Sequence, residues 1–374
     1  MRGNDFLLLS KLTQEQELLQ GTIREFAVAE ISSLASKIDS EARVPGELFE
    51  KLPALGLYGV TVPSEFGGAG ADYLSLLLAV EELSKVSASV GARIAFHNAV
   101  CETIISSTNA RLKSTLLPKL AAGALAAFSV DPKSTIAFKS ESGSIILDGS
   151  SEFVMNADSA EIFLVLAKAK DGSKIFICFQ RADAQNAFDI DEPKKLMGMR
   201  GTGTCKIFFR GLKLSDQSAV FEKDTTSSAL ELFLVSTRLL VAAQALGIAQ
   251  ASLDEGVRYS NERSQFNTKI GRFFAVQDFI AQDEISIQTS RSVTYGAAPP
   301  SSAIEKARDS CIAKISASNA SVQSARHSIR IHGGYGFVKD YPVERYLRDA
   351  RATQLYIEPN EVLKAKIAES LLLK

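Results

Sequence analysis

The sequence contains no tryptophan and is poor in histidine and cysteine. Its 374 residues include three His and four Cys. The cysteines are scattered and form no CxxC pair, which argues against a disulfide framework or a structural zinc site and fits a reducing cytoplasm. His327 and His332 lie five positions apart, a spacing that does not place both on one helix face. We therefore expect no metal centre.

An excess of either charge sign is also absent. The chain carries 42 Lys and Arg against 43 Asp and Glu, a net charge of −1. This balance gives no overall field to attract nucleic acid or an anionic membrane. The longest apolar stretch, residues 239–249, is interrupted by Gln244 and falls short of the roughly 20 residues that a membrane span needs. The apolar patch near the N-terminus is too short for a signal peptide, and no GxSxG motif indicates a serine hydrolase. We expect a cytoplasmic protein with neither nucleic acid nor membrane as partner.

Apolar residues make up 46% of the chain, enough for sizeable cores, and their pattern changes twice. Residues 11–122 show helical spacing, beginning at a capping box of Thr13 and Gln16. Short Ile-, Val- and Phe-rich runs then alternate with turns and predict antiparallel hairpins. Long apolar helices return from about residue 226, and a final helix starts near Asn360. We predict an α+β fold, mostly α, with an N-terminal α-helical domain (1–122), a middle β-domain (123–222) and a C-terminal four-helix-bundle domain (223–374).

A set of motifs follows in order along the chain. They occupy residues 58–70, 198–205, 237–238, 247–250, 263–266 and 333–350. Together they make the chain resemble the acyl-CoA dehydrogenase family over nearly its whole length. The resemblance implies the same α–β–α layout, FAD as cofactor, an acyl-CoA or acyl-carrier-protein thioester as substrate, and a place in fatty acid metabolism. In this chemistry a Glu removes the α-proton, flavin N5 accepts a β-hydride, and an electron-transferring flavoprotein takes the electrons.

The resemblance assigns several residues to the cofactor. Arg263 and Phe266 match the family's Arg-x-x-Phe, which contacts the diphosphate and adenine of FAD across a subunit interface. An arginine suits this role because its planar fork binds phosphate through two hydrogen bonds. Gln277 matches a glutamine facing the same dinucleotide. Backbone approach to the cofactor is expected at the glycine turn Gly333, Gly334 and Gly336. Without the family, the same residues are an ordinary surface arginine and glutamine and a helix-ending turn. The shared site implies a dimer or tetramer, either a homo-oligomer or a hetero-oligomer with an active homologue.

The flavin-ring side departs from the family pattern. The family has Lys-x-Trp-Ile-Thr, in which Trp packs on the isoalloxazine and Thr bonds N5; Phe153 and Met155 stand at these positions. Phe153 is either a stacking ring or a plain core residue, and Met155 can offer only its backbone amide. The preceding loop is shorter than usual by roughly seven residues. Arg330 stands where the family commonly has Gln. The tryptophan that the family packs on the flavin ring is therefore absent from this sequence, and Phe153 stands in its place.

The catalytic base is the second departure. The aligned position is Ile357, which cannot accept a proton, and Glu358 follows one residue later. Glu358 is the candidate base if the loop is re-registered; alternatively it is a solvated acid before a helix N-terminus, where negative charge is favoured. Other family members place the base just before an arginine, here Thr237 before Arg238. Arg238 is a candidate substrate-binding residue, and Asp131 is a more remote candidate base.

Two hypotheses follow from these residues. The first is an active FAD-dependent acyl thioester dehydrogenase that uses Glu358. The second is a non-catalytic paralogue that keeps the fold and the subunit interface as a structural or partner subunit. The motifs near the C-terminus favour FAD binding or assembly, whereas the altered ring pocket and Ile357 favour the second hypothesis. Flavin colour, and its bleaching by an acyl thioester, would distinguish the two.

Overall fold

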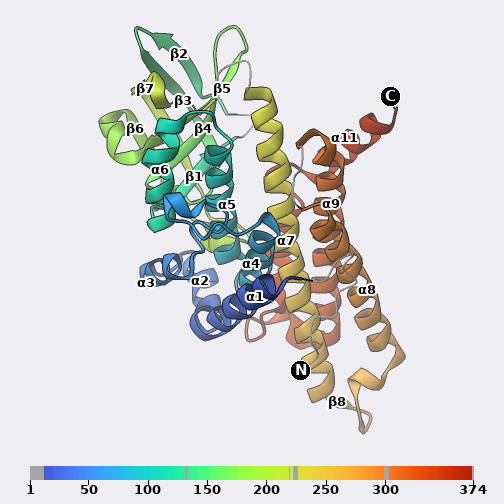
Figure 1. Ribbon diagram of the computed structural model, residues 1–374. Helices are drawn as coiled ribbons and strands as arrows, with labels where there is room; N and C mark the ends of the chain where they lie inside the picture. The colour runs from blue at the N-terminus through green and yellow to red at the C-terminus, as the bar shows by residue number, and fades with distance from the viewer. Residues whose placement is uncertain (1–11, 131–133, 219, 222–225, 299–302, 373–374) are drawn as a thin grey trace.

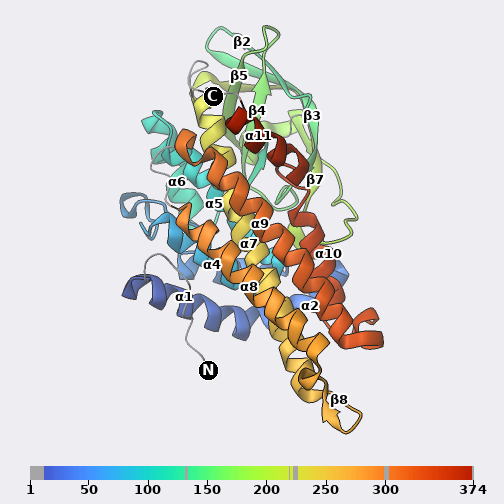
Figure 2. The same cartoon turned by 90° about the vertical axis from the view of Figure 1, so that its right-hand side faces the viewer.

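The computed structural model describes residues 12–130, 134–218, 220–221, 226–298 and 303–372. A helical N-terminal part, a central sheet and a long C-terminal bundle follow one another along the chain, as Figure 1 shows. The predicted fold class is confirmed. In Figure 2 the longest helices of the bundle run side by side, with the sheet at one end of the molecule.

Six α-helices lie in the described residues of the N-terminal part. They are α1 (Gln14–Phe26), α2 (Ala35–Glu41), α3 (Gly46–Lys51), α4 (Tyr73–Val86), α5 (Ala88–Ile105) and α6 (Ala110–Ala122). Helix α1 begins at the predicted capping box, in which Thr13 and Gln16 bond each other's backbone amides. Helix α6 continues through Pro118, although a proline inside a helix ordinarily ends or kinks it. The carbonyl that Pro118 leaves without a donor belongs to the exposed Ser114, where water can bond it.

The sheet has seven strands within the part of the chain that the structure describes. They are β1 (Ala126–Ser129), β2 (Ala137–Glu141), β3 (Ser144–Val154), β4 (Ile162–Lys168), β5 (Lys174–Gln180), β6 (Phe188–Ile190) and β7 (Cys205–Ser215). Their order is β1-β4-β2-β3-β7-β6, with β5 pairing β4. The predicted hairpins β2–β3 and β4–β5 are antiparallel, as are β3–β7 and β6–β7. Strand β1, however, pairs with β4 in parallel, so the sheet is mixed. The β2–β3 hairpin provides the long connection that a parallel pair requires.

The bundle is built from α7 (Thr226–Glu262), α8 (Phe274–Gly296), α9 (Ala303–His332), α10 (Val343–Thr353) and α11 (Asn360–Leu372). A hairpin of β8 (Ser264–Gln265) and β9 (Thr268–Lys269) joins α7 to α8. Helix α7 packs against α9, α4 and α5. A Cβ at Gly247 would lie 2.4 Å from the carbonyl oxygen of Glu81, so this glycine permits the close approach of α7 and α4.

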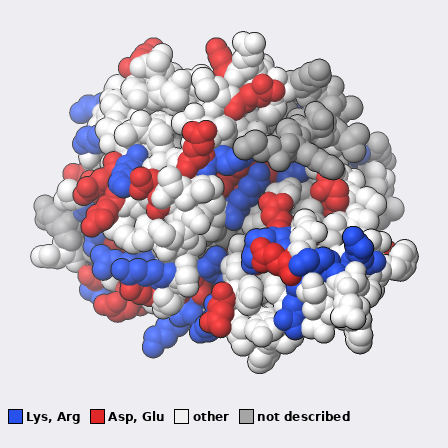
Figure 3. Space-filling view, turned by 90° about the horizontal axis from the view of Figure 1, so that it is seen from below, with Lys and Arg blue, Asp and Glu red and all other residues white. Residues whose placement is uncertain are grey.

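Helix α7 corrects one sequence argument. It is long and apolar enough to cross a membrane, contrary to the expectation that its apolar stretch is too short. However, 89% of its most apolar window is buried inside the protein, which is the pattern of a core helix. On the face shown in Figure 3, basic and acidic side chains are interspersed. This distribution agrees with the near-zero net charge of the sequence.

Candidate active site

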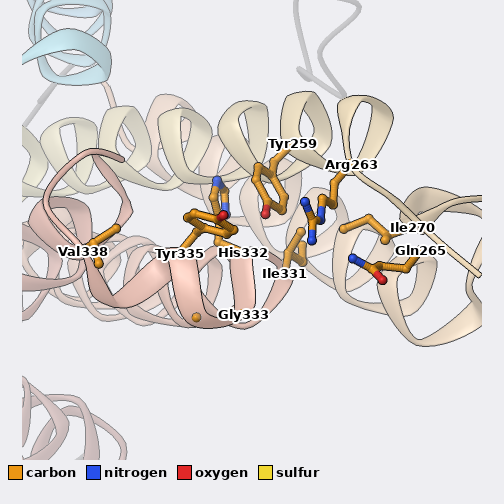
Figure 4. Close-up of a pocket in the computed structure, with 10 residues that line it drawn as sticks. Tyr259, Arg263, Gln265, Ile270, Ile331, His332, Gly333, Tyr335 and Val338 are labelled. Carbon is orange, nitrogen blue, oxygen red and sulfur yellow. The ribbon is translucent and has the colours of Figure 1, made fainter.

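A cavity of about 490 Å³ opens at the far end of the bundle (Figure 4). Its wall comes from the end of α7, the β8 hairpin and the turn that follows α9. Three of the residues assigned to the cofactor from the sequence, Arg263, Gly333 and Gly334, line this cavity together. They are about 70 positions apart in the chain and meet because α7 and α9 end at the same level.

Arg263 directly follows the last residue of α7, and its side chain is exposed. The guanidinium carbon lies 5.9 Å from the centre of the Tyr335 ring. With the amide of Gln265 oriented to satisfy both groups, its oxygen accepts a hydrogen bond from Arg263 Nη2 at 2.6 Å. No carboxylate among the described residues pairs with Arg263. Its positive charge is therefore available to an anionic ligand.

The glycine turn consists of two open residues and one packed residue. Gly333 adopts a left-handed conformation at φ +58°, which ends α9. A Cβ at Gly333 or Gly334 would meet no atom within 4 Å, so the backbone there is open to a ligand. At Gly336 a Cβ would lie 2.5 Å from the carbonyl oxygen of Ile329. The structure thus places Gly336 against α9 and outside the cavity wall.

Sequence reasoning missed two further members of the cavity wall, His332 and Tyr259. Their rings stack at 4.1 Å, and His332 Nδ1 lies 2.7 Å from the carbonyl oxygen of Ser328. His332 Nε2 is 3.4 Å from Glu255. Burial alone would raise the pKa of Glu255, but hydrogen bonds from His332 and Arg258 lower it to about 2. The position of His332 directly before the glycine turn was the available signal.

Phe266 and Gln277 lie outside the cavity wall. The Phe266 ring is 90% exposed at the tip of the β8–β9 hairpin, and the Gln277 amide donates to the carbonyl of Gly271 at 3.1 Å. Phe274 and Phe337 are similarly exposed at this end of the bundle. We refer to Phe266, Phe274 and Phe337 as the hairpin patch. Such clustered apolar exposure is typical of a surface that another chain covers. The cofactor roles of Phe266 and Gln277 stay predictions.

The predicted flavin-ring residues lie on and just after β3. Phe153 is 61% exposed, and the ammonium of Lys194 lies 4.8 Å above its ring. Phe153 is therefore no core residue, and Lys194 lies over one face of its ring. Met155 is half-buried against the main core. The hydroxyl of Ser151 on the same strand is buried and has no partner in the described parts of the chain. Asp131 lies outside the described residues.

The loop between α10 and α11 carries the predicted base region; we call residues 354–359 the reaction loop. Ile357 lies in the left-handed region at φ +65°, which is unfavourable for a β-branched residue and marks strain. The hydroxyl of Tyr356 bonds Gln244, the residue that interrupts the apolar stretch of α7. Ile357 packs partly buried against the main core. The loop is thus held firmly with an apolar side chain at the aligned base position.

Glu358 is surrounded by basic groups from three helices. Its carboxylate accepts from Arg238 Nε on α7 at 2.6 Å and from Lys366 Nζ on α11 at 2.7 Å. Its backbone carbonyl accepts from Lys314 Nζ on α9 at 2.8 Å. Burial would raise the pKa of Glu358, but the bonds from Arg238 and Lys366 lower it overall. The carboxylate is ionised but committed to partners within the chain, which argues against it as a base.

Arg238, the predicted substrate-binding residue, is enclosed. It is 1% exposed, and besides Glu358 it bonds Glu231 at 3.0 Å. Only its Nη2 lacks a partner within the described residues. Thr237, at the second family base position, donates its hydroxyl to the carbonyl of Phe233 in its own helix at 2.9 Å. Neither side chain therefore offers a free base or an open cation.

Arg348 and Asp349 of α10, which precede the reaction loop, fasten this helix to other parts of the chain. Sequence reasoning had not given either residue a role. Arg348 forms ion pairs with Asp39 and Glu344, each at 2.7 Å. Asp349 accepts from the backbone amide of Met199 at 2.6 Å, and burial raises its pKa to about 6. Two motifs that are distant in sequence, at residues 198–205 and 348–350, are thus joined in the fold.

Comparison with known proteins agrees with this arrangement. Residues 13–124 match the family described as "Acyl-CoA dehydrogenase, N-terminal domain", and residues 227–372 match "Acyl-CoA dehydrogenase, C-terminal domain". An acyl-CoA dehydrogenase of Bacillus subtilis is 32% identical over 378 residues, covering 96% of this chain and 99% of the relative. A 3-(aryl)acrylate reductase of Clostridium sporogenes is 32% identical with the same coverage. The solved structure of butyryl-CoA dehydrogenase from Megasphaera elsdenii is 28% identical, with a TM-score of 0.92, and the match covers 97% of this chain and 99% of that chain.

Proposed function

Because the chain belongs to the acyl-CoA dehydrogenase family, we propose that it binds FAD and removes hydrogen from Cα and Cβ of an acyl thioester. Members of this family are flavoprotein oxidoreductases, and the carrier of the acyl group is CoA or an acyl carrier protein. The observation that carries the proposal is the match to butyryl-CoA dehydrogenase along 97% of this chain at a TM-score of 0.92.

The cavity at the end of the bundle fits the nucleotide half of FAD. Arg263 supplies an uncompensated cation for the diphosphate, and Gly333 and Gly334 present open backbone. On the sheet, the exposed ring of Phe153 would pack on the ring system. FAD, when bound, supplies the hydride acceptor. The protein positions that acceptor against the thioester.

The two half-sites come from different parts of the chain, Phe153 from β3 of the sheet and Arg263 from just beyond the end of α7. The sheet packs near Phe233, whose ring lies 4.8 Å from Phe128 of β1, whereas Arg263 follows thirty residues later. That stretch of α7 spans about 45 Å. We infer that each FAD lies between two copies of the chain, with the hairpin patch buried in their contact. A cytoplasmic homo-oligomer that passes electrons to an electron-transferring flavoprotein completes the proposal.

Proton abstraction distinguishes the two candidate functions. If Glu358 is the base, its carboxylate must first leave Arg238 and Lys366. Breaking such a buried pair costs about 3–5 kcal/mol, a penalty on every turnover. The arrangement of Ile357 and Glu358 specifically favours the second candidate, a non-catalytic structural or partner subunit with weak or no FAD chemistry.

The purified protein provides the test. We expect bound flavin to colour it yellow, and an acyl-CoA added under anaerobic conditions to bleach the flavin absorbance if the chain is active. Loss of bleaching in Glu358→Gln, with FAD still bound, would identify Glu358 as the base. A yellow but unreactive protein that becomes reactive as Ile357→Glu, and not as the matched control Ile357→Gln, would support the partner-subunit function. Colourless protein that cannot be reconstituted with FAD would overturn the dehydrogenase candidate and leave the non-catalytic subunit.

A further inference from the structure

Four aromatic rings form a continuous row beside the reaction loop. Tyr356 of the loop lies 5.7 Å from Phe96 of α5, which lies 5.4 Å from Phe128 of β1, which lies 4.8 Å from Phe233 of α7. All three contacts are edge-to-face, the preferred geometry of aromatic pairs. The three phenylalanines are buried, with at most 9% of the side chain exposed. We call these four residues the aromatic row.

The row begins beside one family base position and ends one helical turn from the other. Its first member, Tyr356, directly precedes Ile357, and its last member, Phe233, accepts a hydrogen bond from Thr237 through its carbonyl. A thioester whose α-carbon lies between residues 357 and 237 would direct the rest of its acyl chain towards these rings. This step rests on the proposed function, since it uses the position of the reacting carbons.

The far end of the row is closed as well. Beyond Phe233 a cavity of about 20 Å³ lies between α4, α5 and α7, with Tyr73 and Glu102 in its wall. That volume holds a single water molecule and no hydrocarbon tail. The Tyr73 hydroxyl donates to the carbonyl oxygen of Ser236 at 2.8 Å, and this bond ties α4 to α7 across the cavity.

The rings cannot easily turn aside. Phe233 also packs on Phe176 of β5 at 5.9 Å, and the Tyr356 hydroxyl is bonded to Gln244. Each ring is therefore held on more than one side, in a core packed at the density of an organic crystal. A longer acyl chain would have to displace one of these packed rings.

We propose that the aromatic row sets the specificity of this chain for short acyl groups, with Phe96 at its centre as the main determinant. A short acyl group ends before the rings. A longer group gains no contact from its additional methylenes, because the space they would occupy is already filled. In a hydrophobic pocket one methylene changes discrimination by about tenfold or more, so the effect of several is measurable.

The experiment compares butyryl-CoA, octanoyl-CoA and lauroyl-CoA binding to the FAD-loaded protein, followed by perturbation of the flavin absorbance. For the unmodified protein we expect butyryl-CoA to bind at least about tenfold more tightly than octanoyl-CoA. In Phe96→Ala, octanoyl-CoA should gain at least about tenfold relative to butyryl-CoA. Phe96→Leu keeps most of the side-chain volume and should shift the chain-length preference less. It provides the test if Phe96→Ala does not fold.

Phe163→Ala is the matched control. Phe163 of β4 is also fully buried and packs on another ring, Phe188, at 4.8 Å, but it belongs to the separate core of the sheet. It should lose similar stability without changing the chain-length preference. Equal binding of butyryl- and octanoyl-CoA by the unmodified protein, or an unchanged preference in both Phe96 variants, would overturn the proposal and leave the function intact. No binding of any thioester by any variant would overturn both.

Discussion

Helix α7 and the residue directly after it place one arginine in each functional region, and the two arginines are in opposite states. Arg263, at the C-terminal end of α7, is exposed, faces a cavity of about 490 Å³ and has no carboxylate partner among the described residues. Arg238, twenty-five residues earlier, is 1% exposed and is bonded to Glu358 and Glu231. The same side chain is thus prepared for a ligand at one end and neutralised by the chain itself at the other.

This contrast separates cofactor binding from catalysis. Burying an unpaired cation is unfavourable, whereas a cation at the surface is solvated by water and remains available to bind an anion. A buried cation must be paired within the chain, and the pairing then holds neighbouring segments in place. The nucleotide end therefore keeps the properties of a binding site, whereas the reaction loop is organised around fixed internal ion pairs.

The largest expected effect is at the reaction loop. Glu358→Leu leaves Arg238 without its main partner, and we expect it to lower the free energy of unfolding by about 3–5 kcal/mol, measured by urea denaturation. The double variant Arg238→Met with Glu358→Leu should recover most of that loss, because no unpaired charge remains buried. A loss below about 1 kcal/mol in the single variant would show that the pair behaves as an exposed one.

The same pair predicts a pH dependence. Because Arg238 and Lys366 lower the pKa of Glu358 below its ordinary 4.5, the pair's stabilisation is complete above that pH. It is lost as the pH falls through the lowered pKa. The stability difference between the unmodified protein and Glu358→Gln should therefore be constant above pH 4.5 and shrink below it. A difference that grows in acid would contradict the assignment.

Lys314 gives the next effect. Its ammonium bonds only neutral acceptors, the carbonyl of Glu358 and the Oδ1 of Asn360, and burial lowers its pKa from 10.5 to about 7. Between these values the unfolded chain holds a proton that the folded chain has released, so stability rises with pH. The unmodified protein should gain a few kcal/mol, in order of magnitude, relative to Lys314→Met between pH 7 and 10. If the free energies of unfolding of the two proteins change with pH in parallel, the lowered pKa of Lys314 is excluded.

At the other end, Arg263→Ala should change binding and leave folding nearly unaffected. Hydrogen bonds to a charged group contribute about 1.5–3 kcal/mol, so FAD affinity should fall about 10- to 100-fold in a fluorescence titration. Arg326→Ala, an exposed arginine of α9 outside the cavity wall, is the control and should bind FAD normally. Equal affinities in the two variants would remove Arg263 from the cofactor site.

The smallest effect concerns the backbone of the reaction loop. At Ile357, where φ is +65°, Gly should give a more stable protein than Ala by about 1 kcal/mol, since only glycine is unstrained there. The order should reverse at Ala352 inside α10, where Gly is less stable than Ala by about 1 kcal/mol. Thermal unfolding of the two pairs measures both differences. If Ala is more stable than Gly at both positions, residue 357 is unstrained.

Much of the fold followed from local patterns. The capping box at Thr13 and the final helix starting at Asn360 depend on neighbouring residues, and both are confirmed. The parallel pairing of β1 with β4 could not be predicted, because it depends on a partner more than thirty residues away. Helix α5 was not recognised as a separate element, since it is buried on nearly all faces and its apolar residues show no amphipathic period.

The candidate site was predictable to a different degree at its two ends. Arg263 and Gly333 could be assigned from the short motifs that contain them, and the fold brings both residues to one cavity. The surroundings of Glu358 were not predictable, because its partners Arg238, Lys314 and Lys366 come from three different helices. The alternative that Glu358 is a solvated acid is wrong, since the residue is 9% exposed. Phe96 gave no signal at all, being one of 21 phenylalanines until its ring neighbours were known.

The length of α7 has a consequence for how the protein responds to dilution. If each cofactor contacts the sheet of one copy and Arg263 of another, an isolated copy contains half of each of two different sites. It then has no complete cofactor site. Separation of a pair then removes both sites at once. Flavin retention and turnover per chain should both fall as the protein is diluted below the dissociation constant of the pair, and added FAD should favour reassembly.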